Sequence, residues 1–596
     1  MSQSTPLIEC VPNFSEGRDM AVIQAITAEI EAVDGARLLD VDPGRATNRT
    51  VVTFVGPPEA VVEAAFRAIA RAATVIDMRH QHGEHPRLGA TDVCPLVPVS
   101  GITMDETVAW ARRLGERVGS ELGIPVYLYE YAASTPERRN LATIRAGEYE
   151  GLAEKLAQPE WQPDYGPTQF NPRTGATVIG ARNFLVAYNI NLNTTSVRRA
   201  NAVAFDLREQ GRVKKSGAAR KGRAAEADGA VGAASAADTT NAADTTNVVN
   251  TQSTPPDAPS EPERIPGKLK AVKAIGWFIE EYGIAQVSMN LTDLQVTPVH
   301  LAFDEACMSA EARGLRVTGS ELVGLIPLES VLAAGRFFLR KQRRSVGVSE
   351  VELVKIAVRS LGLNDLGPFD PEARIIEYRL RDPADTKLAR MSLTDFAAAT
   401  ASESPAPGGG SVAAYVAALG AALSAMVANL SAHKPGMDDR WAAFSDWAEA
   451  GQGYKDRLLA MVDEDTRAFD AVMATLRLPR STPVEISARV DAVEAATRTA
   501  IEVPLSVIRV ALDSMRVMAA MAESGNPSSV SDAGVGALCA RAAIRGAQLN
   551  VAINASGLQD QGFANAMRAE ADALVAAAAA REAEILDLVA KVMGEA

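Results

Sequence analysis

The stretch FLVAYNINL, residues 184–192, alternates between apolar and polar side chains in its second half. The two alternating sets are the apolar Tyr188, Ile190 and Leu192 and the polar Asn189, Asn191 and Asn193. A period of two predicts a β-strand whose two faces have different surroundings. Downstream, the pattern predicts strands at 285–291 and 317–327 and a helix at 298–313 between them. The strand at 184–192 therefore belongs to a layered unit of strands and helices.

The sequence upstream of this strand also alternates between predicted strands and helices. Strands are expected at 7–12, 37–41, 50–55, 93–99 and 125–131, and helices at 20–33, 57–73 and 105–122. Elements of these lengths in this order predict a layered α/β sandwich. We expect two such units, at residues 1–180 and 181–344.

A change in composition interrupts the second unit. Residues 214–267 lack periodic apolar positions and contain the repeat AADTTN at 236–241 and again at 242–247. Such a stretch cannot bury enough apolar area to offset its ordering entropy, so disorder is predicted. Because strands on both sides of it need partners, we expect the segment to loop out of the second unit.

The character of the sequence changes again after residue 390. Ala-rich helical patterns run over 391–596, which predicts an all-helical bundle, and residues 345–390 are expected to join the two halves. Residues 412–432 carry no charge and are long enough to cross a bilayer. Their many small side chains favour close helix packing, so a buried helix of the bundle is expected instead.

Charge and cysteine content exclude several classes of protein. The 60 Lys and Arg residues against 74 Asp and Glu leave a net charge of −14, which argues against general nucleic-acid binding. Four scattered cysteines argue against a disulfide framework or a structural zinc site and are typical of a reducing compartment. The N-terminus MSQSTPLIEC has no signal-peptide pattern. A soluble, cytoplasmic protein without a membrane segment is expected.

Three of the five histidines lie together in RHQHGEHPRLG, residues 79–89. The spacing of His80, His82 and His85 does not match a zinc-binding helix, and the intervening glycine and proline indicate a loop. No metal is therefore expected, and a metal-dependent amidine hydrolase is kept as an alternative. His80 and His82 are interpreted as surface residues. His85 has the setting of an oriented acid–base group.

A polar loop, DVDPGRATNRT, covers residues 40–50. Asp42 starts its Asp-Pro-Gly turn, and a turn-forming role and a role in a site remain equal alternatives. Arg49 stands directly before a hydrophobic strand, where pairing with a structural carboxylate is equally open.

The helical half has its own signature. The sequence PGGGS at 407–411 precedes a long helix, whose N-terminal N–H groups can bind an anion or a polar ring. Flexible glycines followed by an N-cap serine would look the same. Further along, VDEDTRAFD at 462–470 places Asp463 and Asp465 beside apolar flanks. A carboxylate in such a setting tends toward a raised pKa, which suits proton transfer.

Several of these stretches resemble known folate enzymes. The transferase-like stretches are ECVPNFSEG at 9–17, the run at 41–65, GEHPRLGATDVCPLVPV at 83–99, RAGEYEGL at 145–152 and GARNFLVAYNINL at 180–192, which resemble glutamate formimidoyltransferase. APGGGSVAA at 406–414, VDEDTRAF, and SGNPSSVSDAGVGA at 524–537 resemble formimidoyltetrahydrofolate cyclodeaminase. In this order and over nearly the whole chain, they resemble the bifunctional formimidoyltransferase–cyclodeaminase family. The segment at 214–267 and the run around His80 and His82 depart from the family pattern.

The resemblance implies two ferredoxin-like α/β sandwich subdomains followed by a helical cyclodeaminase domain. It implies transfer of the formimino group of N-formimino-L-glutamate to N5 of tetrahydrofolate, in histidine degradation. Cyclisation to 5,10-methenyltetrahydrofolate with release of ammonia follows. Polyglutamylated tetrahydrofolate is the implied co-substrate and no metal is needed. The implied assembly is a homo-oligomeric ring of dimers, an octamer.

The resemblance also implies roles for single residues. His85 corresponds to the transferase base, with Asp42 as a possible support, and Asp465 to the cyclodeaminase acid, with Asp463 as its rival. The implied folate segment comprises Gly166, Pro167, Thr168, Gln169, Phe170, Asn171, Pro172, Arg173, Thr174 and Gly175. The implied cyclodeaminase pocket includes Gly408, Gly409, Gly410 and Ser411.

Two alternatives stay open. A basic run is interpreted either as a solvated helix end or as a track for the glutamate tail of a folate. Its members are Arg336, Arg340, Lys341, Arg343 and Arg344. The chain is alternatively a formimidoyltransferase whose helical half serves only in oligomerisation. The intact PGGGS and the Asp463–Asp465 pair argue against this second alternative.

Overall fold

The computed structural model describes residues 6–45, 48–82, 87–214, 264–381 and 386–594. The chain forms two compact units. The first contains Met1–Val331 and Val358–Leu380, and the second contains Leu332–Ala357 and Arg381–Ala596. His85 and residues 215–263 of the predicted disordered segment lie outside the described residues.

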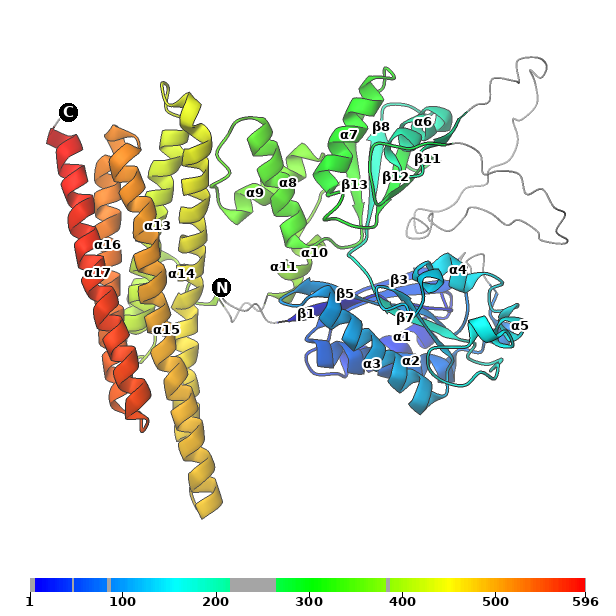
Figure 1. The fold of residues 1–596 in the computed structure, drawn as a ribbon, viewed down its shortest axis with the longest axis horizontal. Coiled ribbons are helices and arrows are strands. Elements are labelled where there is room, and N and C mark those ends of the chain that lie inside the picture. The colour runs from blue at the N-terminus through cyan, green and yellow to red at the C-terminus, as the bar shows by residue number, and fades with distance from the viewer. Residues whose placement is uncertain (1–5, 46–47, 83–86, 215–263, 382–385, 595–596) are drawn as a thin grey trace. The chain divides into compact units, whose positions relative to one another are not determined.

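The first unit begins with a seven-stranded sheet in the order β3-β4-β1/β2-β5-β7-β6, where β1 and β2 share one position. Its strands are β1 (Leu7–Cys10), β2 (Asn13–Phe14), β3 (Arg37–Gly44), β4 (Arg49–Gly56), β5 (Thr91–Ser100), β6 (Val126–Glu130) and β7 (Thr177–Ala181). Helices α1 (Met20–Glu31), α2 (Pro58–Val75) and α3 (Met104–Leu122) cover one face (Figure 1). The first five strands have the order of a ferredoxin-like fold, and β7 and β6 extend it in parallel.

The second sheet is antiparallel, in the order β11-β12-β8-β13. Its elements follow one another as β8 (Val186–Leu192), α6 (Val197–Leu207), β11 (Val272–Ile279), β12 (Ile284–Leu291), α7 (Val299–Glu311) and β13 (Val317–Val323). This βαββαβ order is again ferredoxin-like. The alternating stretch at 184–192 therefore forms a central strand, β8, whereas β7 and β11 are not among the predicted strands.

The polar face of β8 is buried as completely as its apolar face. Asn189 and Asn191 are at most 1% exposed. The Asn189 amide donates to Glu321 Oε2 (3.1 Å), and the Asn191 side chain accepts a hydrogen bond from Gln286 Nε2 (2.8 Å). Cross-strand partners thus bind both asparagines inside the sheet, which lowers the cost of burying them, although Asn189 Oδ1 is buried without a partner.

A short ladder joins the chain on the two sides of residues 215–263. Strand β9 (Arg212–Val213) pairs with β10 (Arg264–Ile265) in antiparallel register. The ends of the segment therefore lie one strand spacing apart, about 4.8 Å.

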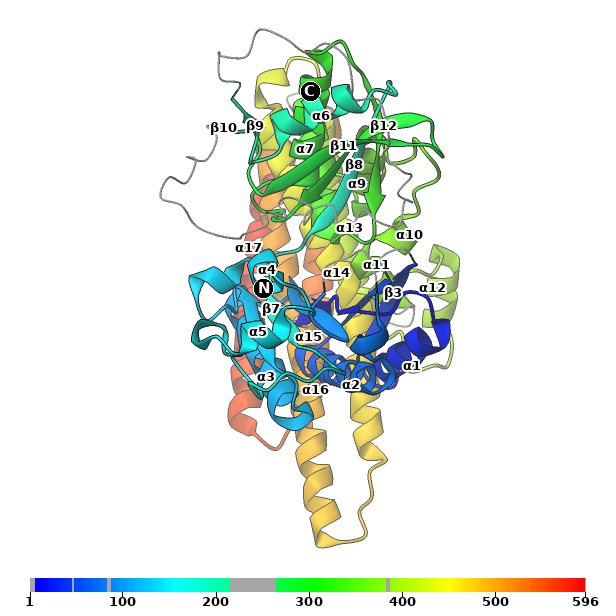
Figure 2. The same ribbon diagram turned by 90° about the vertical axis from the view of Figure 1, so that its right-hand side faces the viewer.

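The second unit is built from long helices. They are α12 (Leu393–Thr400), α13 (Gly409–Ala432), α14 (Trp441–Leu476), α15 (Pro483–Ser524), α16 (Val530–Ser556) and α17 (Gln561–Gly594). Small side chains of α13 and α16 pack with larger ones of α14 and α15 in one core. Figure 2 shows α14 and α15 continuing beyond the other helices as a hairpin. A capping box at Thr482 and a proline at the next position start α15 and so fix the turn of the hairpin.

Helix α13 is the predicted uncharged helix. By length and composition it is able to cross a membrane, and 61% of its most apolar window is buried within the unit. The segment predicted to join the two halves contains α9 (Glu350–Ser360), α10 (Pro371–Arg374) and α11 (Ile376–Leu380), after α8 (Leu328–Lys341). The predicted fold class, two ferredoxin-like α/β subdomains followed by an α-helical bundle, is confirmed.

Candidate active sites

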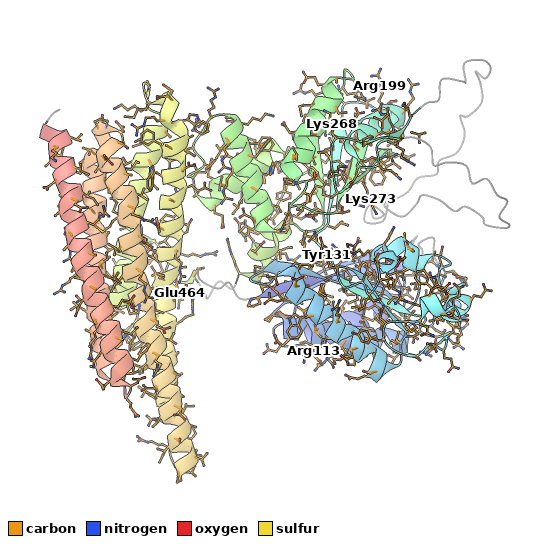
Figure 3. All side chains as sticks on the ribbon, viewed as in Figure 1. Arg113, Tyr131, Arg199, Lys268, Lys273 and Glu464 are labelled. Carbon is orange, nitrogen blue, oxygen red and sulfur yellow. The ribbon has the colours of Figure 1, made fainter. Side chains whose placement is uncertain are left out.

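A cavity of about 800 Å³ lies in the first unit. Alternate residues of β2, β4 and β5 face the cavity, because their neighbours along each strand pack against the helices, whereas β3 contributes the consecutive residues 40–42. The polar lining from the first sheet includes Glu9, Asn13, Asp42, Arg49 and Thr53. Ala187, Lys273, Asn290 and Thr292 line it from the second sheet. Figure 3 labels two of the lining residues, Tyr131 after β6 and Lys273 in β11.

The histidine motif is only partly described. Residues 83–86, and with them His85, lie outside the described residues, whereas His80 and His82 are exposed. Among the described residues, no group of three or more His, Cys, Asp or Glu side chains is placed to hold a metal ion.

A buried polar network surrounds the described flanks of this motif. Gln81 Nε2 donates to Glu16 Oε2 (2.9 Å), and its own side-chain oxygen accepts from Asn48. The Asn48 amide also donates to the His82 carbonyl (3.2 Å), and Arg87 donates to the Gln81 carbonyl (2.8 Å). Side chains from three separate stretches of sequence therefore hold the backbone on both sides of 83–86.

The implied folate segment, residues 166–175, contacts these flanks rather than the cavity. Among the described residues, none of the ten lines the 800 Å³ cavity. Phe170 packs on the ring of Tyr149, with 5.6 Å between ring centroids. Two backbone hydrogen bonds join the segment to the flanks, from Met78 N–H to the Arg173 carbonyl (3.0 Å) and from Ala90 N–H to the Thr174 carbonyl (2.9 Å). The next residue, Ala176, adds a third by donating its N–H to the Leu88 carbonyl (3.1 Å). Residues 173–176 thus bind the backbone on both sides of residues 83–86 of the histidine motif.

Two buried arginines line the cavity. Arg49 donates to the Asn13 side chain (2.6 Å), and Arg145, the last residue of α4 (Leu141–Arg145), pairs with Asp92 (2.5 Å). Asp92 is fully buried and also accepts the Leu88 N–H (3.0 Å). Arg49 therefore binds an asparagine side chain. Arg145 begins the stretch RAGEYEGL, which carries part of the family resemblance but gave no indication that Arg145 belongs to a site.

Asp42 and Glu9 contribute carboxylates to the cavity wall. Asp42 lies in β3 opposite Val51 and is half-buried. Glu9 lies in β1 and is 3% exposed. Burial raises the pKa of Glu9 to about 7, against the field of Arg182 and with a small contribution from Glu377. Glu9 was missed as a site residue, although a single acid inside the apolar strand LIEC was the signal for it.

In the helical unit, the structure brings Asp465 onto the first turn of α13. Ser411 donates its hydroxyl to Asp465 Oδ2 (3.0 Å) and its backbone N–H to the same carboxylate. A Cβ at Gly410 would lie only 2.1 Å from Asp465 Oδ1, so the approach requires glycine. Burial raises the pKa of Asp465, and the two Ser411 hydrogen bonds partly offset this effect.

Asp463 has different neighbours. Its two oxygens accept the N–H groups of Leu388 (2.8 Å) and Ala389 (3.0 Å), and it is 5% exposed. Glu464 between the two aspartates, labelled in Figure 3, pairs with Arg457. The three consecutive acids of α14 therefore serve three separate contacts, and among them Asp465 meets the glycine-rich helix start.

Of the implied pocket, Gly408 and Gly409 lie at the same helix start. Gly408 is the N-cap residue of α13. A Cβ at Gly409 would lie 3.5 Å from Asn550 Nδ2, an ordinary contact distance. In the basic run, Arg336 (2.9 Å) and Arg340 (3.5 Å) both pair with Glu449. These pairs favour the helix-end interpretation of the run.

Family models match the chain in three consecutive parts. The formiminotransferase domain, N-terminal subdomain, matches residues 7–182, and the formiminotransferase domain matches 187–381. The formiminotransferase-cyclodeaminase model matches 392–573. The order of the matches follows the order of the two α/β subdomains and the helical bundle.

Characterised relatives match either the whole chain or one half. Formimidoyltransferase-cyclodeaminase of Rattus norvegicus is 41% identical, over 97% of this chain and 98% of its own length. Glutamate formimidoyltransferase of Streptococcus pyogenes serotype M1 is 36% identical, over 56% of this chain and 93% of its own. Methenyltetrahydrofolate cyclohydrolase of Methylorubrum extorquens is 39% identical, over 33% of this chain and 95% of its own. The chain therefore belongs to the formimidoyltransferase–cyclodeaminase family.

Proposed function

We propose that the chain is a bifunctional folate enzyme. It transfers the formimino group of N-formimino-L-glutamate to tetrahydrofolate and then cyclises 5-formiminotetrahydrofolate to 5,10-methenyltetrahydrofolate, releasing ammonia. One observation carries the proposal: two separate sites, the cavity of the first unit and the Ser411–Asp465 pair of the second, lie in a chain whose full-length relatives have both activities in their name.

In the transfer step, N5 of tetrahydrofolate attacks the amidine carbon of formiminoglutamate. N5 loses its proton, the bond from carbon to the glutamate nitrogen breaks, and that nitrogen gains a proton. A neutral imidazole suits this exchange near pH 7, and we assign it to His85, with Asp42 of the cavity wall in support. The bracing of the loop flanks by residues 171–176 supports a role of that segment beside the same reaction.

In the cyclisation step, N10 attacks the formimino carbon and loses its proton, while the departing nitrogen is protonated and leaves as ammonia. We assign the acid to Asp465. Its raised pKa favours the protonated form that a general acid needs, and Ser411 orients its carboxyl group. Asp463 is committed to two backbone N–H groups and is the weaker assignment.

Cyclohydrolase activity is the second candidate for the helical half, because a relative of this half is named methenyltetrahydrofolate cyclohydrolase. Such an enzyme acts on the same five-membered ring carbon with water in place of ammonia. The full-length match to formimidoyltransferase-cyclodeaminase favours ammonia release as the activity of this chain.

The test follows the products of the two steps separately in the full-length chain. Formiminoglutamate and tetrahydrofolate are supplied, and glutamate, ammonia and the absorbance of the methenyl product are recorded. We expect all three to appear, with glutamate first. Glutamate without ammonia would leave a transferase with a helical oligomerisation module, and ring opening of supplied methenyltetrahydrofolate would favour the cyclohydrolase.

We further propose a cytoplasmic homo-oligomer, a ring of dimers, that uses polyglutamylated tetrahydrofolate in histidine degradation and needs no metal. These proposals rest on the family resemblance and on the acidic, cysteine-poor sequence. Light scattering of the purified protein and transfer assays with folates of different tail length, with and without a chelator, test them.

A further inference from the structure

The two buried arginines of the cavity are anchored at neighbouring positions of the first sheet. Asn13, which holds Arg49, pairs in register with Val93 of β5. Asp92, which holds Arg145, directly precedes Val93. Neighbouring strands lie about 4.8 Å apart. The residues that hold the two arginines are therefore neighbours on β2 and β5, and both arginines, 7% and 3% exposed, line the cavity.

The end of the cavity that these arginines line adjoins the histidine loop. The Asp92 carboxylate that binds Arg145 also accepts a hydrogen bond from the Leu88 N–H. Leu88 is the second residue after 83–86. The other end lies near Glu9, which pairs with Val97 of β5. Val97 is four residues beyond Val93, about 13 Å along the strand. Arg182, whose charge acts on Glu9, lies at that distant end.

We propose that Arg49 and Arg145 form the subsite that binds the two carboxylates of N-formimino-L-glutamate. The inference rests on the proposed function and identifies the part of the cavity that recognises the smaller substrate. In this assignment the two guanidinium groups bind the two carboxylates, with Arg145 keeping its ion pair with Asp92, and Asp42 in the same wall binds the cationic amidine. Guanidinium groups bind carboxylates through paired N–H donors, which adds geometric specificity to charge.

The glutamate tail of the folate is the competing source of carboxylates. In a folate, an aminobenzoyl group separates the tail from N5, so a tail carboxylate lies far from the reacting atoms. In formiminoglutamate, the α-carboxylate is attached to the carbon next to the reacting nitrogen. Cations beside the histidine loop therefore suit formiminoglutamate, whereas Arg182 at the distant end suits the folate tail.

Lys155 of α5 (Leu152–Leu156) is assigned as a positioning residue for this subsite. Its ammonium donates to the carbonyls on either side of Arg145, those of Ile144 (2.5 Å) and Ala146 (2.8 Å). It thereby closes the C-terminal end of α4, where cations are favoured. The backbone from which the Arg145 side chain extends is fixed in this way.

The experiment compares Arg49→Lys and Arg145→Lys with the wild type in the full-length chain. Lysine keeps the charge and loses the paired N–H donors. We expect KM for formiminoglutamate to rise about 10- to 100-fold, with KM for tetrahydrofolate unchanged. The preference for formiminoglutamate over formiminoglycine, which lacks the side-chain carboxylate, should fall by a similar factor.

Arg138→Lys is the matched control. Arg138 is another buried arginine of the same unit, paired with Asp164 (2.8 Å), and it is not among the residues lining the cavity. Its replacement should lower thermal stability without changing substrate preference. The double variant Arg145→Met with Asp92→Asn removes both charges of the pair and guards against misfolding of a single variant. Thermal unfolding of each variant reports on the folding of the first unit, and cyclisation of supplied 5-formiminotetrahydrofolate reports on the helical unit.

The results of these assays distinguish failure of the proposed subsite from failure of the proposed transfer reaction. A rise in KM for tetrahydrofolate alone, or an unchanged preference over formiminoglycine, overturns the dicarboxylate subsite. Equal effects of Arg138→Lys and Arg145→Lys on substrate preference overturn it as well, because they would reflect general destabilisation. A wild-type chain that releases no glutamate overturns the proposed transfer itself and the subsite with it.

Discussion

At the scale of single residues, the surroundings of each carboxylate separate structural from chemical roles. Asp463 accepts two backbone N–H groups, whereas Asp465, two positions along the same helix, is held by Ser411 at the start of α13. Glu9 is buried in the cavity wall beside Arg182. Proximity in the sequence is therefore a poor guide to the partners that an acid finds in the fold.

Replacing Asp465 by asparagine tests the proposed cyclodeaminase acid. We expect Asp465→Asn to lower ammonia release about 10²- to 10⁴-fold while glutamate release persists, so that 5-formiminotetrahydrofolate accumulates. In the wild type, ammonia release should fall as the pH rises through the raised pKa of Asp465, because only the protonated acid donates.

Asp463→Asn is the control for this variant. It should lower the free energy of unfolding by about 1–3 kcal/mol, since it weakens two hydrogen bonds to a buried carboxylate, and it should leave cyclisation largely intact. A dead Asp463→Asn beside an active Asp465→Asn would reverse the assignment.

His85→Ala tests the transferase base. Removal of a general base lowers the rate about 10²- to 10⁴-fold, so glutamate release should fall by this factor. Cyclisation of supplied 5-formiminotetrahydrofolate should persist, because that step is assigned to the helical unit. Near-normal glutamate release in this variant would transfer the role of base to Asp42, His80 or His82.

Glu9→Gln tests the effect of burial on a titrating group. The pKa of Glu9 rises from its ordinary value of 4.5 to about 7 on folding. The folded state therefore holds the proton more tightly, and its stabilising contribution is complete below pH 4.5 and is lost as the pH rises through about 7.

Urea unfolding of the wild type and of Glu9→Gln, at about pH 5 and about pH 8, measures this contribution. Between these pH values the wild type should lose up to about 3 kcal/mol more than the variant. Other titrating groups are common to both proteins and cancel in the comparison. Parallel pH profiles would show that Glu9 ionises in the folded state as easily as in the unfolded one.

At the scale of elements, the start of α13 joins two distant parts of the chain. Gly410 lets the Asp465 carboxylate approach the helix end, and Ser411 binds it there. In the first unit, the segment at 171–176 similarly braces the flanks of the histidine loop through backbone hydrogen bonds. A side chain of α14 makes the contact at the helix start, whereas the backbone makes the contacts beside the histidine motif.

Gly410→Ala and Gly409→Ala form a matched pair that tests the helix start. Alanine at Gly410 would place a Cβ 2.1 Å from Asp465 Oδ1, whereas alanine at Gly409 meets Asn550 only at 3.5 Å. We expect Gly410→Ala to lower ammonia release on the order of 10²-fold by displacing the acid. Gly409→Ala should remain active, and neither change should disrupt α13, because alanine is a better helix former than glycine. Equal activity of the two variants would contradict the proposed geometry.

At the scale of the whole molecule, the chain consists of two units with separate cores. Each unit contains the complete set of described residues that its proposed reaction uses. The composition of residues 214–267 predicts that this segment belongs to neither core. Its described ends are joined by the β9–β10 ladder, so we expect the fold of the second sheet not to depend on the length between them.

Replacing residues 218–262 by a short turn tests this prediction. Because Val213 pairs with Arg264, a tight connection spans the gap without strain. Glutamate release, ammonia release and the melting temperature should all stay near the wild-type values. Loss of transfer or of assembly in this variant would show that the segment packs or joins subunits.

The spacing of apolar side chains predicted two layered α/β units followed by a helical bundle, because that spacing is a local property, although it missed β7 and β11. The ferredoxin-like type of the two subdomains came from the family resemblance. The sequence also located the histidine loop and the glycine-rich helix start. Only the tertiary structure decided which distant residues meet. Arg145 reaches Asp92 across 53 positions, and Ser411 reaches Asp465 across 54. Such contacts, and the burial of Glu9, depend on how sheets and helices pack, which no local pattern records.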